Sequence, residues 1–258
     1  MFQLEQVSFS ISQGKNSCTL LSPISVNFEL GKVYGLIGHN GSGKSTLIKL
    51  MARQNPISAG TILLDGKNIN QWSSRDFAKR VAYLPQHLPS ATNLTARELI
   101  AMGRYAWNGL FGRETEKDRQ AVSEALERTH TQQFANQLVD TLSGGERSRI
   151  WLAMLLAQQS QFLLLDEPLA ALDIAHQVEV MQLIQQLSRE LHLGVIIVIH
   201  DINLASQFCD HLVALHSGKL LAQGDAFQIV NTPSLQEIYG IELNVITHPK
   251  NHRPVSFF

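Results

Sequence analysis

The residues with the clearest chemistry form one glycine-rich stretch, which runs Gly38-His39-Asn40-Gly41-Ser42-Gly43-Lys44-Ser45. It matches the pattern G-x-x-x-x-G-K-[ST] at every fixed position. Glycines let successive backbone N–H groups turn inward around an anion, and a helix that begins there adds its positive end. Lys44 can reach the β- and γ-phosphates of a nucleotide, and the Ser45 hydroxyl suits Mg²⁺, a hard cation. The stretch, with Thr46 after it, therefore predicts the binding site of a nucleoside triphosphate.

The flanks of this stretch supply the elements that the motif needs. Residues 33–37 are apolar and partly β-branched, as in a short buried strand. After the motif, apolar side chains recur at helical spacing, at Leu47, Ile48, Leu50 and Met51. The motif therefore lies between a predicted strand and a predicted helix, which is the context that a phosphate-binding loop requires. This context argues against the alternative that the glycines only form an ordinary turn.

Polar side chains also stand where three other predicted strands end. Asp166 and Glu167 follow the apolar run 162–165, and His200 follows 195–199. Gln86 comes two residues after the run 81–84. Because the carboxyl ends of parallel strands meet at one edge of a sheet, we expect these side chains to lie near the phosphate stretch.

Each of these side chains has a role that suits its chemistry. Asp166 is predicted to hold Mg²⁺, through water, together with Ser45. Glu167 is the candidate general base that orients and polarises an attacking water. His200 can donate a hydrogen bond to the γ-phosphate, and the Gln86 amide can touch both the metal and the water. Taken singly, the acids can cap the next turn and His200 can be an ordinary turn residue, so the hydrolytic site rests on the whole set.

A second glycine pair stands at the start of another predicted helix, in Leu142-Ser143-Gly144-Gly145-Glu146. Ser143 and Glu146 have the spacing of a capping box, which is the plainer interpretation. Adjacent glycines at a helix start also expose backbone N–H groups and make a second anion site. One phosphate does not need two helix N-termini from distant parts of one chain. We therefore expect a dimer in which each copy covers the nucleotide held by the other, and we expect ATP to drive its formation.

Length, charge and cysteine content narrow the class of protein. The 258 residues suit one large domain, or one domain with a sub-domain. The formal net charge is -1, from 21 basic and 22 acidic residues, so we expect no nucleic-acid partner. Two cysteines, Cys18 and Cys209, suit a reducing compartment. We expect no secretory signal, and no apolar run approaches the roughly 18 residues that span a bilayer, so any membrane role requires a partner.

The order of the predicted elements indicates an α/β protein with a single domain over residues 1–258. Residues 1–30 alternate as half-buried strands around a turn at 13–16 and form an N-terminal antiparallel β part. Residues 87–157 are mainly helical, with a capping box at Thr95-Ala96-Arg97-Glu98 that opens a short helix ended by Gly103, then helices over 114–129 and 150–157. We expect this helical sub-domain, about 87–157, to be inserted into a RecA-like P-loop NTPase core made of residues 1–86 and 158–258.

The remainder of the core is predicted from the later part of the chain. A long amphipathic helix is expected over 174–192, with Gly194 just past its end, before the strand 195–199. Residues 212–222 predict a hairpin, and the tail after about 225 carries one more helical stretch.

This set of motifs resembles that of the ATP-binding cassette (ABC) ATPases, over nearly the whole chain. Its parts are the stretch 38–45, Gln86, the signature 142–146, His200, and the run Leu163-Leu164-Leu165-Asp166-Glu167-Pro168 with Ala171-Leu172-Asp173. The signature separates this family from other P-loop enzymes. The resemblance implies ATP and Mg²⁺ as cofactors, and Ser45, Gln86 and Asp166 at the metal. It also implies an ATP-sandwich dimer, in which the residues that contact the other copy's nucleotide are Ser143, Gly144, Gly145 and Asp173.

The sequence departs from the usual pattern of the family in three places. Ile11 stands where an aromatic side chain usually stacks on adenine, which predicts looser discrimination among nucleotides. Leu169-Ala170-Ala171 replaces a stretch that usually carries Thr and Ser, and Ser148 replaces a Gln. The lost hydroxyls predict weaker contacts across the dimer, although Asp173 is kept.

Within the family, the sequence resembles one branch in particular, the ATPases of importers for ferric siderophores and vitamin B12. The likeness lies in the runs 35–40, 71–74, 82–86, 103–107, 173–177 and 200–205. It implies the energy-coupling ATPase of a bacterial importer for ferric hydroxamate siderophores, with vitamin B12, haem or another ferric chelate as alternatives. It also implies permease subunits, a separate binding protein and attachment to the cytoplasmic face of the inner membrane, with the exposed part of 87–113 as the permease dock.

A soluble cassette that acts in translation or DNA repair is the rival from another class. Such proteins usually carry two cassettes or a long coiled-coil insertion, and this chain has one cassette and no heptad run. An exporter ATPase is weaker still, because exporters usually fuse the cassette to spanning helices.

Overall fold

The computed structural model describes residues 1–13, 16–109 and 113–258. The turn predicted at 13–16 and the tip of the predicted docking segment, 110–112, lie outside the described residues or at their border. Within the described residues, no helix combines the length and the apolarity needed to cross a membrane.

A six-stranded sheet forms the centre of the molecule, in the order β10-β9-β3-β8-β7-β6. The strands are β3 (Val33–Ile37), β6 (Val81–Leu84), β7 (Phe162–Leu165), β8 (Gly194–Val198), β9 (His211–His216) and β10 (Lys219–Gly224). All neighbours pair in parallel except β9 and β10, which form the predicted antiparallel hairpin. Strands β3, β7 and β8 are buried at every residue, which explains their continuous apolar sequences.

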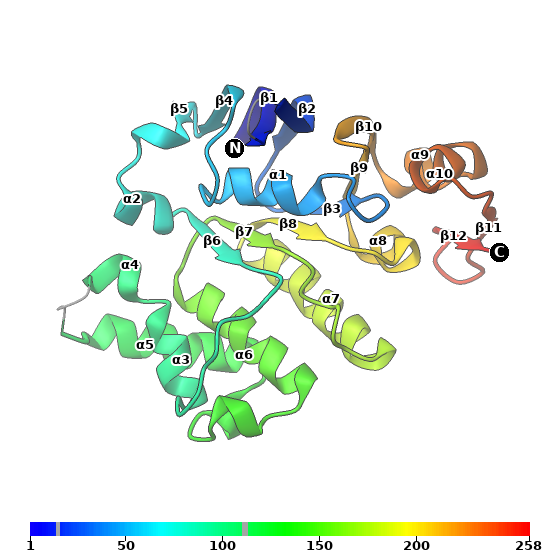
Figure 1. The fold of residues 1–258 in the computed structure, drawn as a ribbon. Coiled ribbons are helices and arrows are strands. Elements are labelled where there is room, and N and C mark those ends of the chain that lie inside the picture. Colours follow the sequence, from blue (N-terminus) through cyan, green and yellow to red (C-terminus); the bar gives the residue numbers. More distant parts are fainter. Residues whose placement is uncertain (14–15, 110–112) are drawn as a thin grey trace.

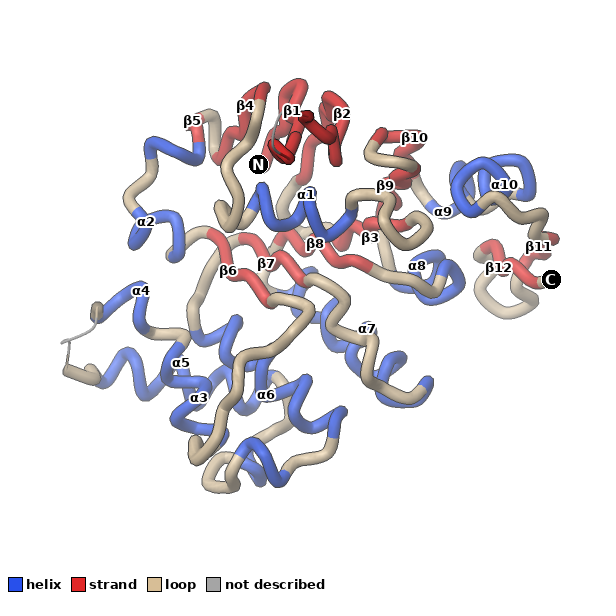
Figure 2. The backbone as a smooth tube through the Cα atoms, viewed as in Figure 1, coloured by secondary structure: helices blue, strands red, loops and turns tan. Residues whose placement is uncertain are grey.

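A second, antiparallel sheet covers one face of the molecule, in the order β2-β1-β4-β5. Its strands are β1 (Phe2–Gln13), β2 (Asn16–Phe28), β4 (Ala59–Leu64) and β5 (Lys67–Asn68). Register shifts along β1 interrupt the simple alternation of the N-terminal residues. Helix α1 (Lys44–Met51) lies between this sheet and the central one (Figure 2). Their shared core includes Leu36, Leu47 and Ile196, all fully buried.

The opposite face of the central sheet packs on helices. Helix α7 (Ile174–Glu190) lies beside the sheet, and α3 (Ala96–Met102), α4 (Tyr105–Asn108), α5 (Glu116–Arg128) and α6 (Gly144–Ala157) form a separate group below it in Figure 1. Ile150 of α6, Ile184 of α7 and Ile197 of β8 belong to one continuous core. This group lies between β6 and β7 in sequence, as the predicted fold class requires, and the capping box predicted for α3 is present. The connecting segments add α2 (Ser74–Ala78) and three short 3₁₀ turns, at Ile69–Gln71, Gln132–Phe134 and Val139–Thr141.

Two predictions about the later elements were wrong. Helix α7 ends at Glu190, before the predicted end at 192, and the next strand, β8, runs over Gly194–Val198 rather than 195–199. Gly194 is there for close packing, because a Cβ at this position would lie 2.3 Å from the ring of Phe162.

The tail is also richer than the single predicted helical stretch. After α8 (Ile202–Phe208) and the β9–β10 hairpin come α9 (Ala226–Ile229), α10 (Thr232–Tyr239) and a hairpin of β11 (Asn244–Thr247) with β12 (Pro254–Phe257). The helical stretch divides because Asp225 and Asn231 each cap a new helix start.

Candidate active site

The phosphate stretch links the end of β3 to the start of α1, as its flanks predicted. Gly38 has φ +139°, and a Cβ there would lie 2.1 Å from the Leu215 carbonyl oxygen, so only glycine fits. Gly43 precedes α1 in the left-handed region, with φ 104°, and no side chain caps the helix. The first N–H groups of a helix have no intrahelical partner, so those of α1 remain available to a phosphate.

Lys44 lies across this loop. Its Nζ donates to the carbonyl oxygens of Gly38, at 2.8 Å, and His39, at 2.9 Å. The side chain is buried, and this burial lowers the pKa of Lys44 although the nearby charges of Glu167 and Asp166 oppose the shift. The ammonium group is therefore held at the loop that is predicted to receive the phosphates.

Asp166 and Ser45 meet at the end of β7. The Ser45 Oγ donates to Asp166 Oδ1 at 2.7 Å, and Asp166 is fully buried. Its second oxygen, Oδ2, is buried without a hydrogen-bond partner among the described residues. Burial raises the pKa of Asp166, against the effect of the Ser45 hydrogen bond. A buried carboxylate oxygen without a partner, beside a hydroxyl, fits a hard divalent cation such as Mg²⁺.

Glu167 is held between side chains from the ends of two other strands. Gln86 Nε2 donates to Glu167 Oε2 at 2.8 Å, and His200 Nε2 lies 2.9 Å from Glu167 Oε1. Glu167 also has φ 53°, a left-handed conformation that is strained for a residue with a Cβ. Gln86, Glu167 and His200 therefore converge as the sequence suggested, with His200 contacting the acid directly.

His39 has a contact that the motif alone did not reveal. Its ring lies edge-on to that of His216, with centroids 4.6 Å apart, and its Nδ1 lies 2.7 Å from the Asn40 carbonyl oxygen. His216 ends β9, which pairs in parallel with β3 and so finishes beside the phosphate stretch. No local pattern marks His216, because the contact depends on strand order. Gly41 and Thr46 occupy the loop and the first turn of α1, and Ser42 is buried within the loop.

The signature residues, 142–146, lie together at the start of α6 and share no hydrogen bond with the phosphate stretch among the described residues. Ser143 caps α6 and Glu146 completes the box, with its Oε2 accepting from the Ser143 backbone N–H at 2.9 Å. A Cβ on Gly145 would lie 2.3 Å from the His176 ring, and His176 Nδ1 lies 2.8 Å from Asp173 Oδ1. Among the described residues, no hydrogen bond joins Ser143, Gly144, Gly145 or Asp173 to residues 38–46.

The three departures from the family pattern also have defined places. Ile11 is 39% exposed on β1, opposite Cys18. Ser148 and Ala170 line a cavity of about 100 Å³ that also touches Gln86 and Glu167. Small side chains at these two positions therefore border the candidate base.

This fold and this constellation define a P-loop ATPase, and comparison with known families specifies which kind. The family model described as "ABC transporter" matches residues 21–170. The chain belongs to the ABC transporter family, and within it is an ATP-binding cassette that hydrolyses ATP to ADP and phosphate.

Similarity to three curated relatives extends over most of the chain. The iron(3+)-hydroxamate import ATP-binding protein of Bacillus subtilis is 38% identical over 242 residues, which are 94% of this chain and 90% of the relative. The petrobactin import ATP-binding protein FpuC of Bacillus anthracis is 45% identical over 222 residues, 86% of this chain and 82% of the relative. The ferric enterobactin transport ATP-binding protein of Escherichia coli is 38% identical over 245 residues, 95% and 90% of the two chains.

Solved structures agree on the fold. The dimeric bacterial ABC transporter cassette MJ0796 has a TM-score of 0.76 at 26% identity, over 87% of this chain and 98% of that one. An ABC transporter in an inward-facing conformation has a TM-score of 0.84, over 100% of this chain and 97% of its own. Its identity is 21%, so this second likeness concerns the fold alone.

Proposed function

We propose that this chain is the energy-coupling ATPase of an importer for ferric siderophore complexes, with ferric hydroxamates as the cargo. The observation that carries the hydrolytic role is the arrangement of Glu167 between Gln86 and His200, beside the phosphate stretch. The cargo class rests on relatives that are named for the import of iron(3+)-hydroxamate, petrobactin and enterobactin.

The site residues divide the work of hydrolysis between them. The backbone of 38–46 and the Lys44 ammonium bind the β- and γ-phosphates. Glu167 accepts a proton from the attacking water, while Gln86 and His200 fix the direction of its carboxylate. His200 is also placed to donate to the γ-phosphate. Mg²⁺, held by Ser45 and by Asp166 through water, with Gln86 beside it, would neutralise charge on the phosphates when bound.

A second copy of the chain is the partner that completes the site. The start of α6 does not hydrogen-bond to the phosphate stretch of its own chain. Its backbone N–H groups at Gly144 and Gly145, together with Ser143 and Asp173, would instead cover the nucleotide of the other copy. We further propose that the exposed part of residues 87–113 docks the permease at the cytoplasmic face of the inner membrane, with a binding protein acting on the other side. Met102 and Tyr105, which are 40% and 52% exposed, belong to that docking surface.

The role of Glu167 is tested with Glu167→Gln. The amide keeps the shape of the side chain and cannot accept the proton, so phosphate release should fall by about 100-fold or more while ATP still drives dimerisation. Phosphate release and light scattering measure the two properties. Glu237→Gln, on the exposed side of α10, makes the same change of charge and should leave both intact. Full turnover by Glu167→Gln would remove Glu167 from the role of base.

The cargo is tested in cells that lack this chain. Uptake of labelled ferric hydroxamate, ferric petrobactin, ferric enterobactin and vitamin B12 is measured after complementation with the wild type or with Glu167→Gln. Ferric hydroxamate uptake that only the wild type restores would support the proposal. Restoration of another compound instead would keep the ATPase role and replace the cargo, and restoration of none would reject the importer.

A further inference from the structure

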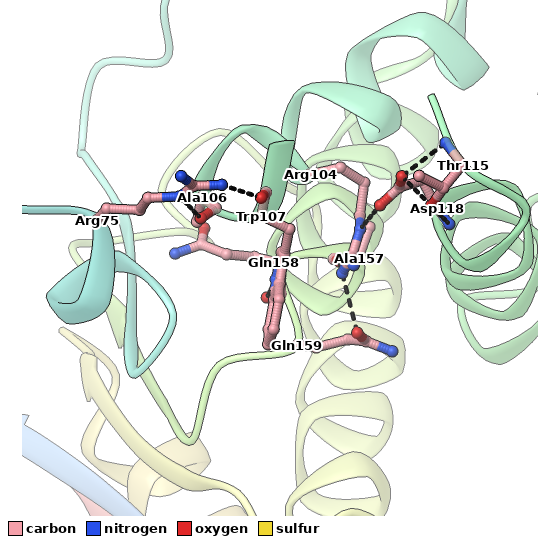
Figure 3. A network of polar contacts seen from close by, with 9 residues as sticks. All are labelled: Arg75, Arg104, Ala106, Trp107, Thr115, Asp118, Ala157, Gln158 and Gln159. Atoms are coloured by element: carbon pink, nitrogen blue, oxygen red, sulfur yellow. Dashed lines mark hydrogen bonds and ion pairs between the residues drawn. The ribbon is translucent and has the colours of Figure 1, made fainter. Parts of the chain in front are cut away.

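The helical group meets the rest of the molecule through a set of polar contacts far from the phosphate stretch in sequence. Arg75 of α2 donates through Nε to the Ala106 carbonyl oxygen of α4 at 3.0 Å, and through Nη2 to that of Trp107. Figure 3 shows the guanidinium group pointing at both carbonyls. Neither contact pairs Arg75 with an acid. Both contacts therefore fix the position of the α4 backbone and do not neutralise a carboxylate.

Trp107 continues the connection toward α6. Its Nε1 donates to the Gln158 carbonyl oxygen at 2.8 Å, directly after the last residue of α6. Its ring contacts two cations, Lys79 Nζ and Arg104 Cζ, each 5.0 Å from the centroid. Lys79 directly follows α2 and Arg104 directly precedes α4, so the ring is held from both sides of the boundary.

Gln158 returns the connection to the central sheet. Its Nε2 donates to the carbonyl oxygens of Ala78 and Val81, the second at 3.1 Å. Val81 is the first residue of β6, the strand that leads to Gln86. Arg75, Trp107 and Gln158, which we call the joint, therefore link α2 and β6 on one side to α4 and α6 on the other.

The end of α6 opposite the joint carries the signature. Ser143 and Gln158 flank this 14-residue helix and are therefore about 22 Å apart at 1.5 Å per residue. Over that length, a tilt of about 5° at the joint moves the signature by about 2 Å. Apolar packing along α6 is not directional, whereas the hydrogen bonds of the joint fix an orientation.

The Gln158 end of α6 cannot easily move alone. Arg104 Nη1 donates to the Ala157 carbonyl oxygen at 2.6 Å, and Arg104 Nε pairs with Asp118 Oδ1 of α5 at 2.9 Å. Both side chains of this ion pair are buried. A displacement at the joint is therefore transmitted to α4, α5 and α6 together.

We propose that Arg75, Trp107 and Gln158 are positioning residues for ATP hydrolysis, because the joint aims α6 and thereby places the signature at the nucleotide of the second copy. This role rests on the dimer of the proposed function. It does not involve nucleotide binding within one chain, since no hydrogen bond among the described residues joins Arg75, Trp107 or Gln158 to the phosphate stretch. Trp107 belongs to the run 103–107 that resembles the importer branch, and Arg75 directly follows the run 71–74.

The test compares Gln158→Met with Gln159→Met in the full chain. Both variants remove a side-chain amide of the same size, but Gln158 bonds across the boundary, whereas Gln159 Oε1 accepts from Arg104 within the helical group. In Gln158→Met we expect turnover at saturating ATP to fall by about tenfold or more, as for a catalytic group displaced by an ångström or two. ATP affinity of the single chain should stay at the wild-type value, and Gln159→Met should keep wild-type turnover.

Dimerisation in the Glu167→Gln background separates the possible failures. The joint predicts weaker ATP-driven dimerisation when Gln158→Met is added, and no change when Gln159→Met is added. Equal turnover and equal dimerisation of the two Met variants would overturn the joint while leaving the dimer in place. Failure of Glu167→Gln alone to dimerise would instead overturn the proposed function and the joint with it.

Arg75→Lys provides a second route if Gln158→Met is poorly folded. Lysine keeps the charge but cannot reach the Ala106 and Trp107 carbonyls as a planar fork does, so the same loss of turnover is expected. Wild-type turnover in Arg75→Lys would count against the joint. Far-UV circular dichroism and thermal melting establish that each variant is folded.

Discussion

Helices α1 and α6 both begin next to glycines, but their first backbone N–H groups are in opposite situations. Gly43 precedes α1 in a left-handed conformation and contributes no side chain, so this end is open. Ser143 and Glu146 close the start of α6 with a complete capping box, formed by the chain itself. The start of α1 therefore has no capping side chain of its own, whereas the start of α6 is already capped in part, at the backbone N–H groups of Ser143 and Glu146.

This difference suggests an order of events. An open helix start has the greater need of an anion, because no side chain caps its N–H groups and its own first turn contains no acidic residue. The α6 end offers only the N–H groups that its capping box leaves over. We expect the nucleotide to bind at α1 first and to recruit the α6 end of a second copy afterwards.

Removal of the cation at the open end should have the largest effect. Lys44→Ala loses an ammonium group at the phosphate site and its bonds to the Gly38 and His39 carbonyls. We expect ATP affinity to fall by about 100-fold or more, since hydrogen bonds to charged groups contribute about 1.5–3 kcal/mol each. Calorimetric titration measures this, with circular dichroism as the control for folding. Tight ATP binding by Lys44→Ala would contradict the assignment of the open end.

A smaller effect is expected from a methyl group at the closed end. A Cβ on Gly145 would meet the His176 ring at 2.3 Å, whereas one on Gly144 would meet Leu172 at 3.6 Å, an ordinary contact. Gly145→Ala must therefore push His176 away from Asp173, and we expect a loss of about 1 kcal/mol in the free energy of unfolding. Gly144→Ala, the matched variant, should cost less than Gly145→Ala in urea denaturation. Equal stabilities would mean that His176 does not constrain the signature.

The smallest effect concerns pH. Hydrogen bonds from the Ser143 side chain and backbone hold the pKa of Glu146 below its ordinary value of 4.5. Because the folded pKa is depressed, the capping box contributes its stability above about pH 4.5 and loses it as the pH falls through the folded value. The amide resonances of Gly144 and Gly145 should therefore shift on acidification, and Glu146→Gln should abolish the shift.

A second capping box and the open end provide the controls for this titration. The pKa of Glu98 is lowered by Thr95 in the same way at the start of α3, so the amides there should titrate alongside those of α6. The start of α1 has no acidic residue in its first turn and should not titrate by this mechanism. If the amide resonances at the start of α1 shifted on acidification and those at the start of α6 did not, the contrast between the open and the capped helix start would be wrong.

The sequence predicted those parts of the site that depend on local chemistry. The strand, loop and helix around Lys44 follow from glycine placement and apolar spacing, and the box at Ser143 follows from an i, i+3 pair. The meeting of Gln86, Glu167 and His200 was also predictable, because each side chain follows the end of a parallel strand. Their individual roles remain predictions.

Other features depend on tertiary contacts that no local pattern records. The joint uses backbone carbonyls as acceptors, so Arg75 and Gln158 leave no complementary residue type in the sequence. Gly194 follows the predicted helix 174–192 in sequence, but the Phe162 ring packed against it is the reason for glycine there. The contact between His39 and His216 depends on the order of strands in the sheet.

The left-handed backbone conformation of Glu167 lowers the stability of the fold, while its carboxylate is proposed to serve hydrolysis. A residue with a Cβ in this region costs about 1–2 kcal/mol, which glycine would avoid and asparagine would reduce. Selection for thermal stability alone would therefore favour Gly or Asn at position 167, at the expense of turnover. In a library of variants selected only for thermal stability, Glu167 should be among the first residues to be substituted. Variants with Gly or Asn at this position would be more stable and inactive.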